Sequence, residues 1–202
     1  MAPPLHFLHP GPVDDGPRRA RPWHRQGVPV RPSPSPYAAH VRAQLDCPDA
    51  WADAVVATLA AAGVVVDSTA PVGVAVAPGR LVSAVVDAWC VDSLPHVLVS
   101  VQPYAVEVGP WVAPGVGPCA RCVAAGVLDE GGPAPAGAVP RPLLALGAGT
   151  VARDLGAWSR GEVPHTWLTS WRVDHEPLPV ARRWHRHPYC GCAWFETATD
   201  TG

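Results

Sequence analysis

The chain has 202 residues, of which 48% are hydrophobic, and its formal net charge is −2. This length suits one domain of ordinary size, and the charge gives no attraction to nucleic acid or to an anionic membrane surface. No stretch of about 18 apolar residues is present that could cross a membrane. All 15 basic residues are arginine, and lysine, asparagine and isoleucine are absent, which excludes Schiff-base chemistry and a phosphate-binding lysine.

A proline-rich segment opens the chain. Residues 1–36 are rich in proline, arginine and histidine without periodicity, so we expect an irregular arm with one short strand at residues 27–30. This arm is either a solvated extension or a partner-binding segment. We expect residues 37–202 to form a single domain. The amino terminus, Met-Ala-Pro-Pro, lacks a basic and then apolar signal segment, which predicts a cytoplasmic protein.

The first regular elements are predicted to be helices. A short helix is expected over residues 38–45, and a clearer one begins at Pro48 and ends at Gly63. Proline suits the first helical position, the carboxylate of Asp49 favours the positive end of the helix dipole, and glycine commonly ends a helix. Four apolar residues share one face of this helix: Trp51, Val55, Leu59 and Ala62.

Short apolar runs alternate with helices through the middle of the chain. We expect strands at residues 64–66, 72–76, 96–101 and 105–108, and a helix at residues 80–91. That helix is expected to bury Leu81, Val85, Ala88 and Trp89. The alternation favours a parallel α/β sheet. Asp67 follows the first of these strands, where α/β proteins bind ligands, but a loop or helix-capping role explains it equally well.

A long helix and a last strand complete the predicted fold. Residues 131–139 should be exposed, and a helix then begins at Pro142 and runs to about residue 159. Its apolar stripe is formed by Leu144, Ala148, Val151, Leu155 and Trp158, with Arg153 and Asp154 off the stripe. The small residues at 147–149 should let this helix lie close to the sheet, since no strand precedes them to make a nucleotide loop. Residues 166–173 resemble a strand.

Four of the six cysteines form two closely spaced pairs. Cys119 and Cys122 form a Cys-x-x-Cys motif, and Cys190 and Cys192 form a Cys-Gly-Cys motif far downstream. Two short cysteine turns separated by a long insert are typical of a structural zinc site. A redox dithiol would begin a helix directly after a strand, which residues 118–121 do not suggest, and two disulfides would need an oxidising compartment. These alternatives, and unpaired core cysteines, remain open.

Other residues near these motifs are weaker candidates. His185 and His187 could bind a metal, but four thiolates already complete a tetrahedron, so a supporting or surface role is expected. Trp184 and Trp194 flank the second motif among arginine and histidine residues, and we expect them to be exposed at an interface. The two remaining cysteines are most simply small apolar residues on predicted helices: Cys47 and Cys90.

Three segments carry a resemblance to a known family. They are Val-Val-Val-Asp-Ser-Thr at residues 64–69, Gly-Pro-Trp-Val-Ala-Pro-Gly with the following Cys-x-x-Cys at residues 109–122, and His-Pro-Tyr-Cys-Gly-Cys at residues 187–192. Over roughly residues 50–195 the chain resembles the carboxyl half of a ThiF/MoeB-type adenylating domain, and more specifically the ThiF-like component of azoline-forming peptide cyclodehydratases. That component works beside a YcaO-type ATP-using enzyme in making thiazole- and oxazole-modified peptides. The resemblance implies a partial Rossmann-like sheet with helices on both faces, and a structural zinc bound by the four paired cysteines.

The chain departs from the family pattern at the positions that serve ATP. ThiF-type domains hold ATP with a Gly-rich strand–turn–helix in an amino-terminal half and with lysine and asparagine, and the sequence shows none of these. Where the family has a second aspartate for Mg–ATP, three residues after Asp67, this chain has Ala70. A winged-helix peptide-binding region is also not visible in residues 1–50. We therefore predict no catalytic or nucleotide-binding residue.

The resulting prediction is a degenerate ThiF-like zinc protein that acts as a non-catalytic partner in modified-peptide biosynthesis. It would bind a YcaO-type cyclodehydratase or a second ThiF-like subunit, or form a homodimer, and would help to position the precursor peptide. One alternative is an adenylyltransferase completed by another chain that supplies the nucleotide loop. A second is a zinc-ribbon module for nucleic acid, against which the net charge argues. Missing strands should leave an open sheet edge near residues 64–66.

Overall fold

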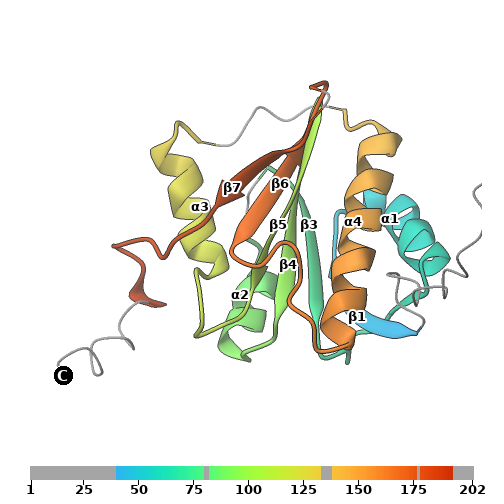
Figure 1. Cartoon of the computed structure of the whole chain (residues 1–202), viewed down its shortest axis with the longest axis horizontal. Helices are drawn as coiled ribbons and strands as arrows, with labels where there is room; N and C mark the ends of the chain where they lie inside the picture. Colours follow the sequence, from blue (N-terminus) through green and yellow to red (C-terminus); the bar gives the residue numbers. More distant parts are fainter. Residues whose placement is uncertain (1–39, 80–81, 133–137, 177, 193–202) are drawn as a thin grey trace, which may run out of the picture. The chain divides into compact units, whose positions relative to one another are not determined.

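A seven-stranded sheet with the order β2-β1-β3-β4-β5-β6-β7 organises the chain (Figure 1). The structure is a computed structural model, and it describes residues 40–79, 82–132, 138–176 and 178–192. The chain divides into two units, residues 1–33 and residues 34–202, and every described residue belongs to the second. The arm expected over residues 1–36, with its strand at residues 27–30, lies outside the described residues.

The first four strands of this sheet are parallel and the last three are antiparallel. The parallel strands are β1 (Val41–Asp46), β2 (Val64–Val66), β3 (Gly73–Pro78) and β4 (His96–Gln102). The antiparallel strands are β5 (Ala105–Val112), β6 (Thr169–Val173) and β7 (Val180–Arg183). The expected parallel sheet is thus correct only for the first four strands. Only residues 103–104 connect β4 to β5, and so short a turn permits only an antiparallel pair.

Residues 41–46 form a strand, so the helix expected over residues 38–45 is wrong. Val41 and Ala43 are buried while Arg42 between them is exposed, which is the period of two of a strand. β1 lies in the sheet between β2 and β3 and pairs with both. The hydrogen bonds and burial at this internal position outweigh the local helix preference of alanine, arginine, glutamine and leucine.

Helices cover both faces of the sheet, as expected. α1 (Asp49–Ala61) and α4 (Arg141–Ser159) pack over the larger core on one face, and α2 (Ala84–Val91) and α3 (Ala120–Asp129) lie on the other face (Figure 1). The predicted apolar faces of α1 and α4 both pack into the larger core. None of the helices in the described ranges is long and apolar enough to cross a membrane.

The small residues of α4 set its distance from the sheet. A Cβ added at Gly147 would lie 2.9 Å from Val106 Cγ2 and 3.3 Å from Val99 Cγ1, whereas one at Gly149 would meet nothing within 4 Å. The close packing expected for residues 147–149 is therefore confirmed at Gly147 and does not apply at Gly149. Because Val99 belongs to β4 and Val106 to β5, Gly147 sits where the parallel and antiparallel parts of the sheet join.

Helix α2 begins later and buries a different face than expected. It begins at Ala84, because the Oγ of the N-cap residue Ser83 accepts a hydrogen bond from the backbone N–H of Val86. Val86 and Trp89 are buried, whereas Val85 is 45% exposed and Ala88 is exposed. Of the expected buried face, Trp89 is correct, and Leu81 lies outside the described residues.

A buried carboxylate fixes the segment that leads from α4 to β6. Asp154, which was expected to lie off the apolar stripe, is fully buried. Its carboxylate accepts hydrogen bonds from the backbone N–H groups of His165 (3.3 Å) and Thr166 (3.0 Å) and from the Thr166 hydroxyl (2.6 Å). These bonds satisfy a charge that would otherwise be costly to bury, and they explain why the expected strand at residues 166–173 begins only at Thr169.

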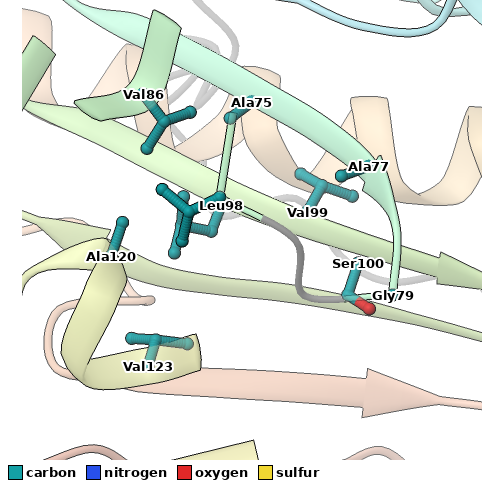
Figure 2. Close-up of a pocket in the computed structure, with 10 residues that line it drawn as sticks. Ala75, Ala77, Gly79, Val86, Leu98, Val99, Ser100, Ala120 and Val123 are labelled. Atoms are coloured by element: carbon teal, nitrogen blue, oxygen red, sulfur yellow. The ribbon is translucent and has the colours of Figure 1, made fainter. Parts of the chain in front are cut away.

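The smaller core, between the sheet and helices α2 and α3, contains a narrow cavity. Figure 2 shows Val86, Ala120 and Val123 of the helices facing Ala75 and Leu98 of the strands. The cavity has a volume of about 20 Å³, and it adjoins the hydroxyl of Ser100, which is buried without a hydrogen-bond partner in the described part of the chain. This space is too small for a substrate.

Candidate metal centre

The four paired cysteines meet at one point. Cys119 Sγ lies 3.7 Å from Cys122 Sγ and 3.6 Å from Cys190 Sγ, and Cys122 Sγ lies 3.3 Å from Cys192 Sγ. All four sulfurs lie within 4.8 Å of one another, and a search of the described ranges finds no other cluster able to hold a metal. Tetrahedral binding with metal–sulfur bonds of about 2.3 Å places the sulfurs about 3.8 Å apart, whereas a disulfide needs about 2.0 Å. The spacing therefore fits a four-thiol metal site.

Helix α3 presents the first pair. Cys119 is its N-cap residue and Cys122 lies in its first turn, so residues three apart project from the same face of the helix. The expectation that this motif does not begin a helix is wrong, and α3 itself was not predicted. The motif follows β5 after the loop of residues 113–118. Because Cys190 and Cys192 lie as near to the pair as its members lie to each other, the arrangement is a four-thiol cluster and not an isolated dithiol.

Arg186 connects the loops that carry the two pairs. Its Nη2 donates a hydrogen bond to the carbonyl of Gly115 at 2.8 Å, and its Nη1 donates to the carbonyl of Cys192 at 3.2 Å. Gly115 has a φ of 84°, a left-handed conformation that favours glycine. One guanidinium therefore joins the loop before the first pair to the end of the second pair, independently of any metal.

The two nearby histidines lie outside the four-thiol cluster, as expected. His187 Nε2 lies 2.9 Å from Asp129 Oδ2, at the end of α3, and its Nδ1 accepts a hydrogen bond from the backbone N–H of Tyr189. Tyr189 is 92% exposed, and His185 is exposed as well. His187 therefore supports the second loop by binding α3, and it contributes no ligand atom.

The surroundings of two of the sulfurs, those of Cys119 and Cys192, favour the protonated thiol. The hydrogen bond from the Cys119 thiol to Cys122, together with burial, raises the pKa of Cys119 to about 12. Burial raises the pKa of Cys192 to about 11. A metal cation reverses this balance, because it replaces the protons and neutralises the thiolates. Four sulfur donors without oxygen ligands suit a soft ion such as zinc, or iron.

A chain of buried polar groups holds β7, the strand that leads to the second pair. Trp184 Nε1 donates to Ser170 Oγ at 2.8 Å, and Ser170 Oγ donates to the buried carboxylate of Glu107. The Arg182 guanidinium lies 3.7 Å above the Trp184 ring. Trp184 is only 4% exposed, so the interface role predicted for it is wrong, and Trp194 lies outside the described residues.

An open groove of about 680 Å³ runs beside the four-thiol cluster. Cys119, Cys190 and Cys192 line it, together with Cys90 of α2. Arg121, also on its wall, makes two hydrogen bonds of 2.8 Å to the carboxylate of Asp87. The groove therefore borders three of the four cysteines of the cluster.

A second position of interest is the turn between β1 and α1. Helix α1 follows β1 and covers one face of the sheet, whereas α2 follows β3 and covers the other face. The carboxyl ends of the neighbouring strands β1 and β3 therefore form a topological switch point. Dinucleotide-binding folds hold phosphate at such a turn with glycine residues and the helix N-terminus. β1, this turn and α1 thus form a strand–turn–helix, which the sequence did not reveal. The segment at the turn, residues 46–49, is Asp-Cys-Pro-Asp and contains no glycine.

The chemistry of this turn opposes phosphate binding. Pro48 has no N–H to donate, and Asp46 and Asp49 place two carboxylates beside the helix N-terminus. Burial, followed by the charges of Asp46 and Asp49, raises the pKa of the intervening Cys47 to about 11. Asp46 also accepts a hydrogen bond from the Ser83 hydroxyl at the start of α2. A polyphosphate at this turn would meet repulsion and no glycine cradle.

Asp67 has a structural role in the loop after β2. Its carboxylate accepts hydrogen bonds from the backbone N–H and hydroxyl of Thr69, both at 2.8 Å, and from Arg42 Nη1 at 2.9 Å. These donors lower the pKa of Asp67, the Thr69 backbone bond most strongly. The side chain of Ala70 is buried, and its carbonyl accepts from Gln44 Nε2. Of the two explanations considered for Asp67, the loop role fits these contacts.

The fold resembles part of the fold of two solved heterocyclases. A heterocyclase in complex with substrate and cofactor matches with a TM-score of 0.60 and 16% identity over 76% of this chain, and the heterocyclase TruD matches with 0.58 and 18% over 78%. MccB from E. coli with MccA-N7isoASN matches with 0.56 and 12%, covering 75% of this chain and 67% of that one. The predicted α/β fold with helices on both faces of the sheet is confirmed. At these identities the likeness concerns the fold.

The chain spans 25% and 28% of the two heterocyclase chains that it matches. No protein-family model matches the sequence, and no curated protein does. Function therefore has to be argued from the site.

Proposed function

We propose that this chain is a non-catalytic, zinc-stabilised ThiF-like component of azole-forming peptide biosynthesis. It binds a YcaO-type cyclodehydratase or a second ThiF-like subunit and helps to present the precursor peptide. The fold likeness to two heterocyclases supports the setting.

The turn between β1 and α1 carries the non-catalytic assignment. An adenylating domain must hold a triphosphate and its magnesium ion, and this chain places Asp46, Pro48 and Asp49 at the switch point. The loop after β2 has the buried Ala70 in place of a metal-binding carboxylate, and Asp67 is engaged by Thr69 and Arg42. The sequence also has no lysine or asparagine, the residues that hold ATP in the family that the chain resembles.

Zinc is the proposed occupant of the four-thiol cluster. Cys119, Cys122, Cys190 and Cys192 would fill all four tetrahedral positions, which leaves no site for a catalytic water, so the ion's role is structural. The ion would join α3 to the loop after β7.

Three measurements test the proposed function. Calorimetry of the purified chain with Mg–ATP is expected to show no heat of binding, and the chain alone is expected to catalyse no exchange of pyrophosphate into ATP. Addition of this chain to the cyclodehydratase encoded beside it is expected to raise the rate of azoline formation on the precursor peptide. Micromolar ATP binding with peptide-dependent exchange would favour the adenylyltransferase alternative, and an unchanged cyclodehydratase rate would refute the partner role.

A further inference from the structure

The second cysteine pair lies in a segment that the sheet does not hold. β7 ends at Arg183, and residues 184–190 belong to no helix or strand. Ordering such a segment costs conformational entropy, and a metal that has to order it loses that free energy from its own binding. Contacts that already hold the segment in place therefore increase the affinity of the cluster for a metal.

Arg186 makes such contacts to both loops of the cluster. Its Nη2 donates to the carbonyl of Gly115 at 2.8 Å, in the loop that leads to Cys119, and its Nη1 donates to the carbonyl of Cys192 at 3.2 Å. Both acceptors are backbone oxygens, so neither bond occupies a sulfur atom. The planar guanidinium has its donors in a fixed fork, and it can therefore set the distance between the two loops.

Leu168 holds the other end of the same two segments. Its carbonyl accepts a hydrogen bond of 2.8 Å from the backbone N–H of Trp184. Its side chain packs closely on the first loop, because a Cβ added at Gly117 would lie 2.5 Å from Leu168 Cδ2. The first loop and the segment after β7 are thus joined at Leu168 and again at Arg186, and the contact of Arg186 is the one next to the cysteines.

We propose that Arg186 is a positioning residue of the metal centre, which holds the two loops at the spacing that four metal-binding sulfurs require. It acts through Cys192 and Gly115 and provides no ligand atom. This role rests on the metal assigned to the cluster in the proposed function. His187 also ties the segment to Asp129 of α3, so loss of Arg186 should loosen the cluster without unfolding the protein.

Arg186→Gln tests this role in the zinc-loaded full chain. Competition with a chelator should give a zinc dissociation constant about 10–100-fold higher than that of the wild type, the range typical of residues that hold metal ligands in place. Arg186→Lys keeps the positive charge, but an ammonium lacks the planar fork that spans two carbonyls, so its constant should lie between those of the wild type and Arg186→Gln. Cobalt bound in place of zinc should show the same absorption spectrum of four thiolate ligands in all three proteins.

Arg183→Gln is the matched control, since it makes the same replacement at an exposed arginine of β7. It should leave the zinc dissociation constant unchanged. Amide hydrogen exchange of the zinc-loaded chain should quicken at residues 185–192 in Arg186→Gln and stay unchanged in β3 and β4, which separates loosening of the cluster from general unfolding.

Wild-type zinc affinity in Arg186→Gln would overturn the proposal. Wild-type affinity in Arg186→Lys would overturn it as well, since charge alone would then suffice, and so would an equal loss of affinity in Arg183→Gln. Arg186→Lys, the milder change, decides between these outcomes if Arg186→Gln does not fold. A wild-type chain that binds no zinc would refute the metal assignment of the proposed function, and the role of Arg186 with it.

Discussion

The two ends of the sheet are stabilised by different means. At the β2 end, the parallel strands β1, β3 and β4 bury apolar side chains, most of them valine, under α1 and α4. The described residues at this end form no metal cluster. At the β7 end, β6 and β7 have few buried side chains: within them only Ser170 is buried. Contacts other than apolar burial hold this end, namely the Glu107–Ser170–Trp184 chain and the four-thiol cluster.

This difference follows from burial. Apolar area removed from water stabilises a strand by roughly 25 cal/mol per Å², and strands that bury little apolar area gain little from it. The β7 end therefore depends on the buried hydrogen bonds of Glu107, Ser170 and Trp184, whereas the β2 end depends on its apolar core. We therefore expect a substitution in the core to increase local unfolding first at the β2 end, and a substitution in the polar contacts to increase it first at the β7 end.

Loss of the four-thiol cluster should have the largest effect. The double change Cys190→Ala and Cys192→Ala should abolish metal binding and lower the free energy of unfolding by roughly 3–5 kcal/mol, because the ion links segments far apart in the chain. Elemental analysis for zinc and iron, together with urea unfolding, measures both quantities. Amide hydrogen exchange should quicken in α3 and β7 and remain slow in β3 and β4.

Cys47→Ala serves as the control, since Cys47 is a half-buried cysteine outside the cluster. It should retain one metal ion per chain. Wild-type metal content in the double variant would contradict a site made by these four cysteines.

Removal of the Asp154 carboxylate should have the next largest effect. Asp154→Ala leaves the backbone N–H groups of His165 and Thr166 and the Thr166 hydroxyl without their acceptor, which should destabilise the protein by roughly 3 kcal/mol. Thr166→Val removes one donor and keeps the carboxylate, so it should cost about 1 kcal/mol. Chemical denaturation measures both variants. Equal losses would mean that the Thr166 hydroxyl alone accounts for the effect.

Gly147 tests the join between the two halves of the sheet. Gly147→Ala places a methyl group 2.9 Å from Val106 Cγ2, and the resulting overpacking should destabilise the fold by a net ~1 kcal/mol after the gain in helix propensity. Gly149→Ala meets open space on the same helix and should stabilise the fold by ~0.5–1 kcal/mol. Thermal unfolding of the two variants should move the midpoint in opposite directions. A shift of the same sign in both would argue against close packing at Gly147.

The smallest expected effect is a pH dependence of the free energy of unfolding, which originates at His96 in the parallel half of the sheet. His96 is fully buried on β4, and burial lowers its pKa below the ordinary value of about 6.5. Below that pH the unfolded chain binds a proton that the folded protein excludes, so stability should fall as the pH decreases, by at most ~1.4 kcal/mol per unit. The difference in unfolding free energy between wild type and His96→Gln, measured from pH 7 to 5.5, isolates this contribution. A pH-independent difference would contradict it.

Much of the fold follows from local pattern. The apolar face of α1, the stripe of α4 and the valine runs of β3 and β4 repeat with helix or strand periodicity, and each was predicted close to its observed position. The spacing of the paired cysteines likewise predicted that four thiols would meet, because two short turns can present sulfurs to one tetrahedron only when they lie together.

The errors occurred where distant contacts overrule local preference. Residues 41–46 favour a helix by composition, and only pairing with β2 and β3 makes them a strand. Trp184 lies among arginines in the sequence, yet Ser170 and α3 bury it. No local signal marks Glu107 or Ser170, because neither belongs to a motif and each becomes important only through the other.

The sequence by itself determined which helices have an apolar face, which residues can bind a metal, and that no lysine or asparagine is available for ATP. The tertiary structure alone decided that residues 46–49 stand at a switch point of the sheet. It also decided that α3 brings Cys119 and Cys122 to Cys190 and Cys192. The physical reason is range: periodicity and turn chemistry act over a few residues, whereas sheet order and burial depend on segments that meet only in the folded chain.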